Sequence, residues 1–372
     1  MINLTADWQD SFTEIECYQD DDVNGVLSRL LSDEQFKRTI GQLFSDSNNT
    51  IVKQLSKLEN IHTIEHVQLW VEETMFPLIA QSYSELTFSG LSELTPSKSY
   101  IFISNHRDIV MDPLLINQAL RANRFSTAHC AIGDNLLVNQ SANDLALLNR
   151  CFKVFRSLKS PKSILKAMKT QSAYIQYLHF NKNENVWIAQ KEGRAKDNID
   201  KTNPALIKML SLAKPKEIVL SDYLSNLNIV PVSLSYEWDP CDIDKALELE
   251  AQETNINHMK SELDDFIATK KGMEGDKGKI HLHFGKAIQA QSTAPLASKQ
   301  VAELIDQEIK KNYQRHPVNF AAYKKIIGFY PEQSNFTKQQ INAAGKQLEL
   351  RLKNQRPEIA KRVYQAYAQI LS

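Results

Sequence analysis

The spacing of apolar residues divides the chain into a helical beginning, a middle with short apolar runs, and a helical end. From about residue 23 to 80, apolar residues recur every three or four positions, as on one face of an α-helix. Pro77 falls near the end of this region and is expected to end or kink its last helix. From about residue 296 onward the helical spacing returns and continues to the end of the sequence.

The middle of the chain contains six short apolar runs that predict β-strands. Each run is rich in β-branched or aromatic residues, and longer helical patterns lie between most of them. One such helix should begin at Ser160-Pro161, a serine N-cap followed by proline at the first helical position. The expected strands are 100–104, 126–132, 151–155, 186–189, 229–236 and 279–285.

Strands that alternate with helices predict an α/β fold with a mainly parallel central sheet and helices on its faces. The chain has 372 residues, enough for one large core with additional parts. We expect a helical N-terminal segment over 1–80, an α/β core over 81–290, and a helical C-terminal region over 291–372.

Composition and charge exclude several classes of protein. Hydrophobic residues make up 42% and charged residues 24%, as in ordinary soluble globular proteins, so extended disorder is excluded. The 44 basic residues balance 44 acidic ones, so global charge gives no case for nucleic-acid binding. The four cysteines are scattered, which predicts reduced thiols in the cytoplasm.

The sequence suggests a protein that meets a membrane only at its surface. No signal peptide and no run of about 18 apolar residues is visible. The acidic residues 1–50 and the basic residues 313–372 give the two ends opposite charge. These charges fit solvated helix faces, a contact between the ends, or a basic surface facing anionic lipid. We expect cytoplasmic location, with peripheral contact at the inner face of the membrane as an option.

The most informative segment, 100–116, joins a buried-looking strand to a helix through Asn105-His106. In open parallel sheets, ligands bind at the carboxyl ends of the strands, which is where this spacing puts His106. Asp108 and Asp112 follow closely, and a carboxylate beside a histidine fixes its tautomer and makes it a better base. Taken alone, the spacing fits a structural histidine with helix-capping aspartates equally well.

The segment 150–169 carries seven basic residues and no acidic one, which suits a phosphate-bearing ligand. A solvated helix face explains part of the run, because the lysines after Pro161 lie opposite Ile164, Leu165 and Met168. Arg156 is less easily explained in that way, because it stands at a strand end. The basic residues are Arg150, Lys153, Arg156, Lys159, Lys162, Lys166 and Lys169.

A third segment, 186–197, contains a strand of bulky residues followed by Glu192-Gly193-Arg194. Glycine permits a tight turn at this point. We expect Glu192 and Arg194 to project near the same edge of the sheet as His106.

Together these segments resemble the glycerophospholipid acyltransferase superfamily, which includes lysophosphatidic acid and glycerol-3-phosphate acyltransferases. The resemblance covers about residues 85–290 and implies a three-layer acyltransferase core. It consists of four ordered blocks: Asn-His followed by Asp, an aromatic strand closing on Arg, a Glu-Gly-x-Arg block, and an apolar strand with Pro. The blocks match here at Asn105, His106 and Asp112; at Phe152, Phe155 and Arg156; at Glu192, Gly193 and Arg194; and at Pro231.

Two departures from the family pattern affect these blocks. Five residues rather than four separate His106 from Asp112, and one residue is missing inside the Glu-Gly-x-Arg block. An extra helical position would rotate the carboxylate by about 100°. An extra residue in the loop before the helix would leave the pairing intact. We expect Asp112 to be the partner of His106, with Asp108 as the alternative.

The resemblance implies a mechanism for acyl transfer. His106, held by Asp112, removes a proton from an acceptor hydroxyl, and the alkoxide attacks the thioester of acyl-CoA or acyl-carrier protein. Glu192 orders the pocket for a phosphate-bearing lipid acceptor. The family needs no enzyme nucleophile, no metal and no cofactor. The implied phosphate ligands are Arg156, Arg194 and Lys153.

Two other functions remain open from the sequence. A thioester hydrolase would use water as the acceptor, and a non-catalytic lipid-binding protein would have lost catalysis with the altered spacing. Glycerol phosphate, lysophosphatidic acid and amino-acid lyso-lipids all remain candidate acceptors. Two histidine pairs, His62 with His66 and His281 with His283, do not add a metal site, because the first lacks a third ligand and the second fits a structural pair better.

Overall fold

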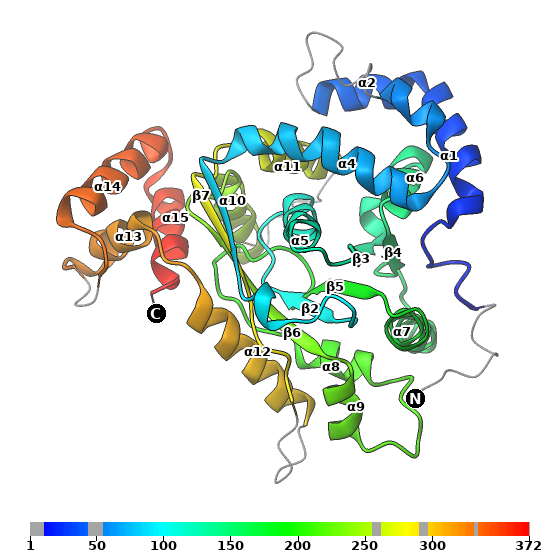
Figure 1. Cartoon of the computed structure of the whole chain (residues 1–372). Coiled ribbons are helices and arrows are strands. Elements are labelled where there is room, and N and C mark those ends of the chain that lie inside the picture. Colours follow the sequence, from blue (N-terminus) through cyan, green and yellow to red (C-terminus); the bar gives the residue numbers. More distant parts are fainter. Residues whose placement is uncertain (1–10, 44–54, 255–261, 290–296, 331–333, 372) are drawn as a thin grey trace.

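The computed structural model describes residues 11–43, 55–254, 262–289, 297–330 and 334–371. Its centre is a seven-stranded sheet in the order β1-β7-β6-β2-β5-β3-β4, with helices on both faces (Figure 1). The predicted α/β fold is therefore confirmed. The strands are β1 (Glu85–Ser89), β2 (Ile101–Ser104), β3 (Ala128–Gly133), β4 (Cys151–Val154), β5 (Asn185–Ala189), β6 (Ile229–Tyr236) and β7 (Lys279–Phe284).

The sheet is mainly parallel, as predicted. Among the described strands, only β6 and β7 pair antiparallel, and β2 lies between β5 and β6 with Ser104 opposite Ala189 and Val232. The carboxyl ends of β2 to β6 therefore meet at one edge. All six predicted strands are present, whereas β1 was missed. Its sequence is half-exposed at the edge of the sheet and forms no apolar run.

Two hydrophobic layers cover the sheet. Because side chains alternate along a strand, Phe102 of β2 faces one layer while Ile101 and Ile103 face the other. The first layer contains α4 (Ile64–Ile79) and α5 (Met111–Ala122). The second contains α7 (Pro161–Gln176), α8 (Pro204–Leu210), α9 (Leu220–Asn226) and α12 (Ser298–Asn312).

The N-terminal helices form a separate cluster against α6 (Gln140–Leu148). They are α1 (Asp20–Ser32), α2 (Glu34–Leu43) and the start of α4. Pro77 lies near the end of α4, and a 3₁₀ turn at Ala80–Ser82 follows, as expected. Further short turns are Ser56–Asn60, Leu91–Glu93, Asp134–Leu136 and the π-helical Tyr177–Asn181.

The C-terminal helices α13 (Pro317–Ile327), α14 (Lys338–Leu352) and α15 (Pro357–Gln369) share a hydrophobic cluster with α10 (Asp242–Glu253) (orange to red in Figure 1). Helix α11 (Glu262–Glu274) precedes β7. Within the described part of the chain, no helix is long and apolar enough to span a membrane.

Candidate active site

His106 lies just beyond the end of β2, and its Nδ1 is 2.8 Å from Oδ2 of Asp112. Helix α5 begins at Met111, so residues 107–110 form the loop between strand and helix. The extra residue of this sequence therefore belongs to the loop, and the contact between imidazole and carboxylate is kept. The prediction that Asp112 contacts His106 is confirmed.

Asp112 is completely buried and accepts four hydrogen bonds. Its Oδ2 accepts from His106 Nδ1 and from the backbone N–H groups of Arg107 and Asp108, at 2.8, 2.6 and 3.0 Å. Its Oδ1 accepts from Tyr236 Oη at 2.7 Å. A carboxylate can only accept, so this contact assigns a proton to Nδ1 of the imidazole and leaves the lone pair on Nε2. The arrangement can remove a proton from a hydroxyl.

Tyr236 is the last residue of β6, the strand beside β2. Burial and the neighbouring Asp112 raise its pKa well above the usual tyrosine range, so the phenol stays protonated and donates. The sequence analysis did not single out Tyr236. Its position could have suggested a role in the site, because a tyrosine at the carboxyl end of a strand next to that of His106 lies at the same edge of the sheet.

Asp108, the alternative partner of His106, caps the start of α5 instead of contacting the imidazole. Its Oδ1 accepts from the backbone N–H groups of Val110 and Met111 at 3.0 and 2.9 Å, which caps the start of α5. Burial and the nearby Asp112 raise its pKa. A Cβ atom on Gly272 would lie 2.0 Å from Asp108 Oδ2, so α11 packs directly against this loop. Asp108 therefore supports the loop and does not orient the imidazole.

Asn105 extends the pairing of β2 with β6 through its side chain. Its Nδ2 donates to the carbonyl of Leu234 at 2.9 Å, and its Oδ1 accepts from Leu234 N–H at 2.8 Å. Nearby, Trp187 donates to Ser104 Oγ at 2.9 Å, and its ring lies edge-on to His106 with centroids 5.8 Å apart. These contacts fix the chain on both sides of His106.

The loop after β5 passes beside His106. Ala195 N–H donates to the His106 carbonyl at 2.9 Å. Gly193 has φ +74°, in the left-handed region that favours glycine, so the predicted tight turn is present. Glu192 is exposed, and its Oε1 lies 3.7 Å from Arg156 Nε.

Arg156 follows β4 at the same edge of the sheet. Its backbone N–H donates to Asp134 Oδ1 at 3.0 Å, and its guanidinium is so close to Gly133 that a Cβ there would lie 2.8 Å from Nε. Lys153 is half-buried within β4. Among the described residues, Lys153 and Arg156 share no hydrogen-bond or ion-pair partner.

Arg194 is nearly buried, with 7% of its side chain exposed. Its Nη2 lies 3.7 Å from Glu248 Oε1 in α10, and Lys196 Nζ lies 2.9 Å from Oε2 of the same residue. Its Nη1 has no hydrogen-bond partner among the described residues. Arg156 and Arg194 thus have different acidic partners. Pro231 lies inside β6, where its carbonyl accepts from Gly285 N–H at 2.8 Å.

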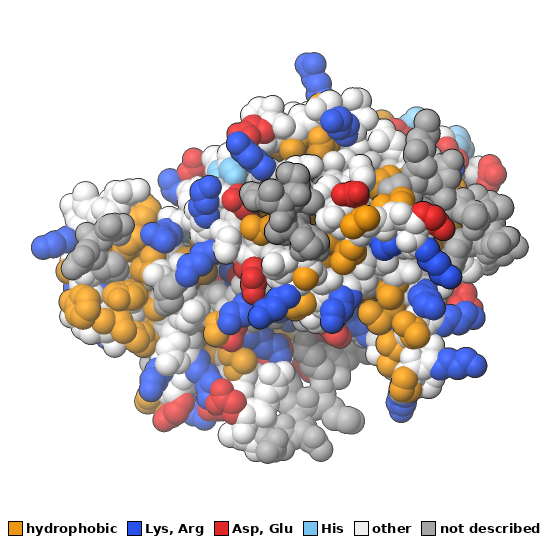
Figure 2. Space-filling view, turned by 90° about the horizontal axis from the view of Figure 1, so that it is seen from below, with side chains coloured by type: hydrophobic (Ala, Val, Ile, Leu, Met, Phe, Trp, Pro, Cys, Tyr) orange, Lys and Arg blue, Asp and Glu red, His pale blue; other side chains and the backbone are white. Residues whose placement is uncertain are grey.

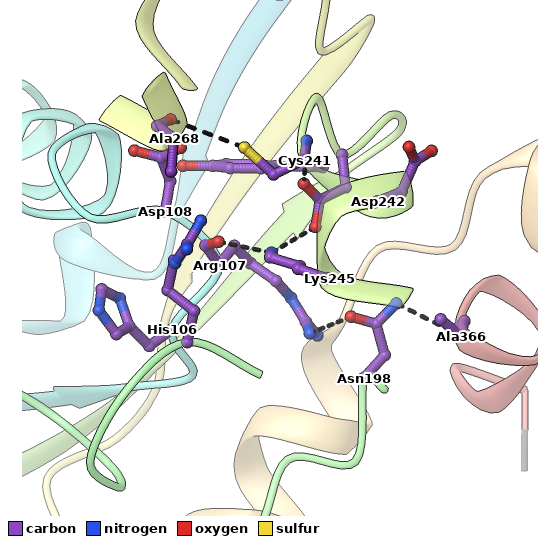
Figure 3. A network of polar contacts seen from close by, with 12 residues as sticks. His106, Arg107, Asp108, Asn198, Cys241, Asp242, Lys245, Ala268 and Ala366 are labelled. Atoms are coloured by element: carbon purple, nitrogen blue, oxygen red, sulfur yellow. Dashed lines mark hydrogen bonds and ion pairs between the residues drawn. The ribbon is translucent and has the colours of Figure 1, made fainter. Parts of the chain in front are cut away.

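The sequence analysis also missed Arg107 and Lys245. Arg107 is buried, its guanidinium donates to Asn198 and Asp200, and its carbonyl accepts from Lys245 Nζ at 2.7 Å (Figure 3). Arginine and lysine side chains are rarely this buried. The local sequence therefore gave no reason to expect Arg107 and Lys245 in the interior beside the loop of His106.

The described residues contain no group of three or more His, Cys, Asp or Glu side chains that could hold a metal ion. His281 and His283 both contact Ser89 Oγ, at 2.9 and 2.8 Å, and His281 also contacts Thr87 Oγ1 at 2.7 Å. They form the structural pair that the sequence favoured.

Comparison with known proteins identifies the class. Residues 85–235 match the family model described as Acyltransferase, which is less than half of the chain and includes His106, Asp112, Arg156 and Arg194. The match covers the segments whose motifs resemble an acyltransferase in the sequence, so it supports an acyltransferase core over these residues. No curated protein matches the chain.

One similar solved structure is the 1-acyl-sn-glycerophosphate (LPA) acyltransferase PlsC from Thermotoga maritima. The similarity covers 77% of this chain and 95% of that chain, with 14% sequence identity and a TM-score of 0.36. At that identity and score, the likeness says nothing about the roles of individual residues.

Proposed function

We propose that the protein is an O-acyltransferase that moves a fatty acyl group from a thioester to a hydroxyl of a glycerol phosphate or lysophospholipid. One observation carries this proposal: His106 is held through Nδ1 by the buried Asp112 at the carboxyl edge of the sheet, with Nε2 left as an acceptor. The match of residues 85–235 to the Acyltransferase family model supports it. The donor is acyl-CoA or acyl-carrier protein.

In the proposed reaction, Nε2 of His106 takes the proton of the acceptor hydroxyl as its oxygen attacks the thioester carbonyl carbon. Asp112 stabilises the imidazolium that forms. The tetrahedral intermediate then collapses, the C–S bond breaks, and the thiolate leaves with the proton from His106. The products are an ester and a free thiol, and no acyl-enzyme forms.

Arg156 is our first candidate for binding the acceptor phosphate. It is exposed beside the loop that passes His106, and its only ion pair among the described residues is the long one to Glu192. A guanidinium binds phosphate oxygens in a bidentate manner. Arg194, with its unpartnered Nη1, is the second candidate, and Lys153 and Glu192 would complete the pocket.

The test is product analysis. The wild-type protein is given isotope-labelled acyl-CoA, or labelled acyl-carrier protein, together with glycerol 3-phosphate, lysophosphatidic acid or no acceptor. Mass spectrometry should find a labelled ester with at least one acceptor and little free fatty acid. Free fatty acid in every mixture would show a hydrolase instead. Bound lipid without any product would show a binding protein.

A further inference from the structure

The segment from Tyr236 to Lys245 contacts the loop of His106 at two points. Tyr236 Oη donates to Asp112 Oδ1 at 2.7 Å. Lys245 Nζ donates to the backbone carbonyl of Arg107 at 2.7 Å. We call this stretch of chain the bridging segment, because it also contacts the C-terminal helices.

The contact with Lys245 fixes the backbone next to His106. On one side of its Cα, the N–H of Arg107 donates to Asp112 Oδ2 at 2.6 Å, and on the other its carbonyl accepts from Lys245 (Figure 3). His106 Nδ1 contacts the same Asp112 oxygen at 2.8 Å. A shift of the Arg107 backbone would therefore disturb the contact that orients the imidazole.

The ammonium of Lys245 is buried, with 2% of the residue exposed, and it forms an ion pair with Asp239. Burial alone would raise the pKa of Asp239, but the neighbouring Lys245 holds this pKa below its usual value. The carboxylate is therefore charged, and a buried ammonium requires such a partner. Lys245 is thus held on one side by Asp239 and contacts the loop of His106 on the other.

The C-terminal helices hold Asp239 by its backbone. Tyr367 Oη in α15 accepts from the N–H of Asp239 at 2.9 Å, and Arg351 in α14 donates to its carbonyl at 2.8 Å. Both side chains also contact Asp242, the first residue of α10, at 3.0 Å. These helices project from one side of the molecule, at the left of Figures 1 and 2.

Helix α15 reaches Arg107 by a second route as well. The Arg107 guanidinium donates to Asp200 and Asn198 and lies 5.5 Å from the centre of the Tyr313 ring. Asn198 Nδ2 in turn donates to the carbonyl of Ala366 in α15 at 2.8 Å. The backbone and the side chain of Arg107 are therefore both tied to the C-terminal helices.

We infer that Lys245 is a positioning residue, through which the C-terminal helices set the geometry of His106. The ammonium acts through the carbonyl of Arg107 and not on the substrate. Lys245, Asp239 and the C-terminal helices lie beyond residue 235, where the family match ends. The inference rests on the proposed function, in which His106 is the general base.

The variant Lys245→Met tests this role, since it removes the ammonium and keeps most of the length of the side chain. We expect kcat to fall about 10- to 100-fold with the KM of the acceptor unchanged, because the base is misplaced while the binding groups remain. Lys214→Met is the control and should keep the wild-type kcat. The Lys214 ammonium also donates to backbone carbonyls, but to those of Pro215 and Ile218.

NMR of ¹⁵N-histidine-labelled protein measures the geometry of the imidazole without any substrate. The signals of His106 are those that are missing from the spectrum of His106→Ala. Nδ1 should be protonated in the wild type, as its contact with Asp112 requires, and Lys245→Met should show a mixture of tautomers. If Lys245 served stability alone, the variant would unfold at a lower temperature with unchanged His106 signals, and the inference would be overturned.

Arg351→Met tests the link to the C-terminal helices, because it removes the donor to the Asp239 carbonyl. It should disturb the His106 tautomer in the same direction but less, with kcat about 2- to 10-fold lower. Arg362→Met is the matched control and should behave like the wild type. Arg362 joins the same region to α10 through Glu253, at 2.6 Å, and among the described residues it forms no ion pair with the bridging segment.

Asn198→Ala gives a further test if Lys245→Met does not fold, because Asn198 is only half-buried. It should disturb the His106 tautomer through the side chain of Arg107. Wild-type His106 signals and wild-type kcat in a folded Lys245→Met or Asn198→Ala variant would overturn the inference. If the signals change as expected but even the wild type makes no ester, the proposed function fails and the positioning role stands.

Discussion

The two ends of the candidate site, Asp112 beyond β2 and Arg156 beyond β4, differ in how firmly the protein fixes their side chains. At the end of β2, Asp112 is completely buried and accepts four hydrogen bonds. At the end of β4, Arg156 is exposed, and the carboxylate that pairs with its guanidinium, that of Glu192, lies 3.7 Å away. An exposed ion pair of this kind contributes at most about 1 kcal/mol, so it yields easily to a ligand. The difference separates a fixed group that does chemistry from an adjustable group that binds.

The largest effect should come from the fixed end. In Asp112→Asn, an NH₂ group must face either the donors of Oδ2 or the phenol of Tyr236. We expect kcat to fall about 10²- to 10⁴-fold, the range of general-base catalysis, because the imidazole loses its orientation. Steady-state rates measure this, with circular dichroism to confirm folding. Wild-type kcat in a folded Asp112→Asn variant would contradict the fixed role of this end.

The adjustable end should affect binding. We expect Arg156→Ala to raise the KM of a phosphate-bearing acceptor about 10- to 100-fold, since hydrogen bonds to charged groups contribute about 1.5–3 kcal/mol. The kcat at saturation should change little. Lys159→Ala is the control, because Lys159 is an exposed neighbour outside the proposed pocket. A fall in kcat at constant KM would place Arg156 among the groups of the fixed end.

A smaller effect is expected from one of the four hydrogen bonds at the fixed end. Tyr236→Phe leaves Asp112 Oδ1 without its donor inside the protein. We expect kcat to fall about 10-fold and the free energy of unfolding to drop by roughly 1.5–3 kcal/mol. Urea unfolding and steady-state kinetics measure the two quantities. An unchanged stability would indicate that water reaches Asp112 and that this end is less sealed than the structure indicates.

The smallest effect concerns Lys277, a buried lysine whose charge interacts with that of Asp108 in the loop of His106. Burial lowers its pKa to about 8. Between pH 8 and about 10.5 the unfolded state therefore binds a proton that the folded state does not, so this residue makes stability rise with pH. The stability of the wild type minus that of Lys277→Met should grow by about 1 kcal/mol from pH 7.5 to 9. A constant difference across these pH values would contradict the burial.

Local pattern was enough to predict the sheet and the site at its edge. Six strands follow from runs of β-branched and aromatic residues, and their carboxyl ends locate His106, Arg156 and Glu192 at one edge. Strand β1 was not predicted, because an edge strand with half-exposed faces needs no apolar run.

Contacts across long sequence separations were beyond prediction. The loop of His106 depends on Lys245 and Tyr236, which lie more than a hundred residues away. No local spacing encodes such pairs, because the tertiary fold brings them together. The sequence could not predict that Arg156 and Arg194 have different acidic partners for the same reason, since Glu248, the partner of Arg194, lies in a distant helix.

The most direct test of the central claim is a double-mutant cycle on His106 and Asp112. The kcat/KM for ester formation is measured for the wild type, His106→Ala, Asp112→Asn and the double variant, with the best acceptor from the product analysis. If the two side chains act as one general base, the double variant should be hardly worse than His106→Ala alone. Losses that multiply, or a His106→Ala variant with wild-type kcat/KM, would contradict the account.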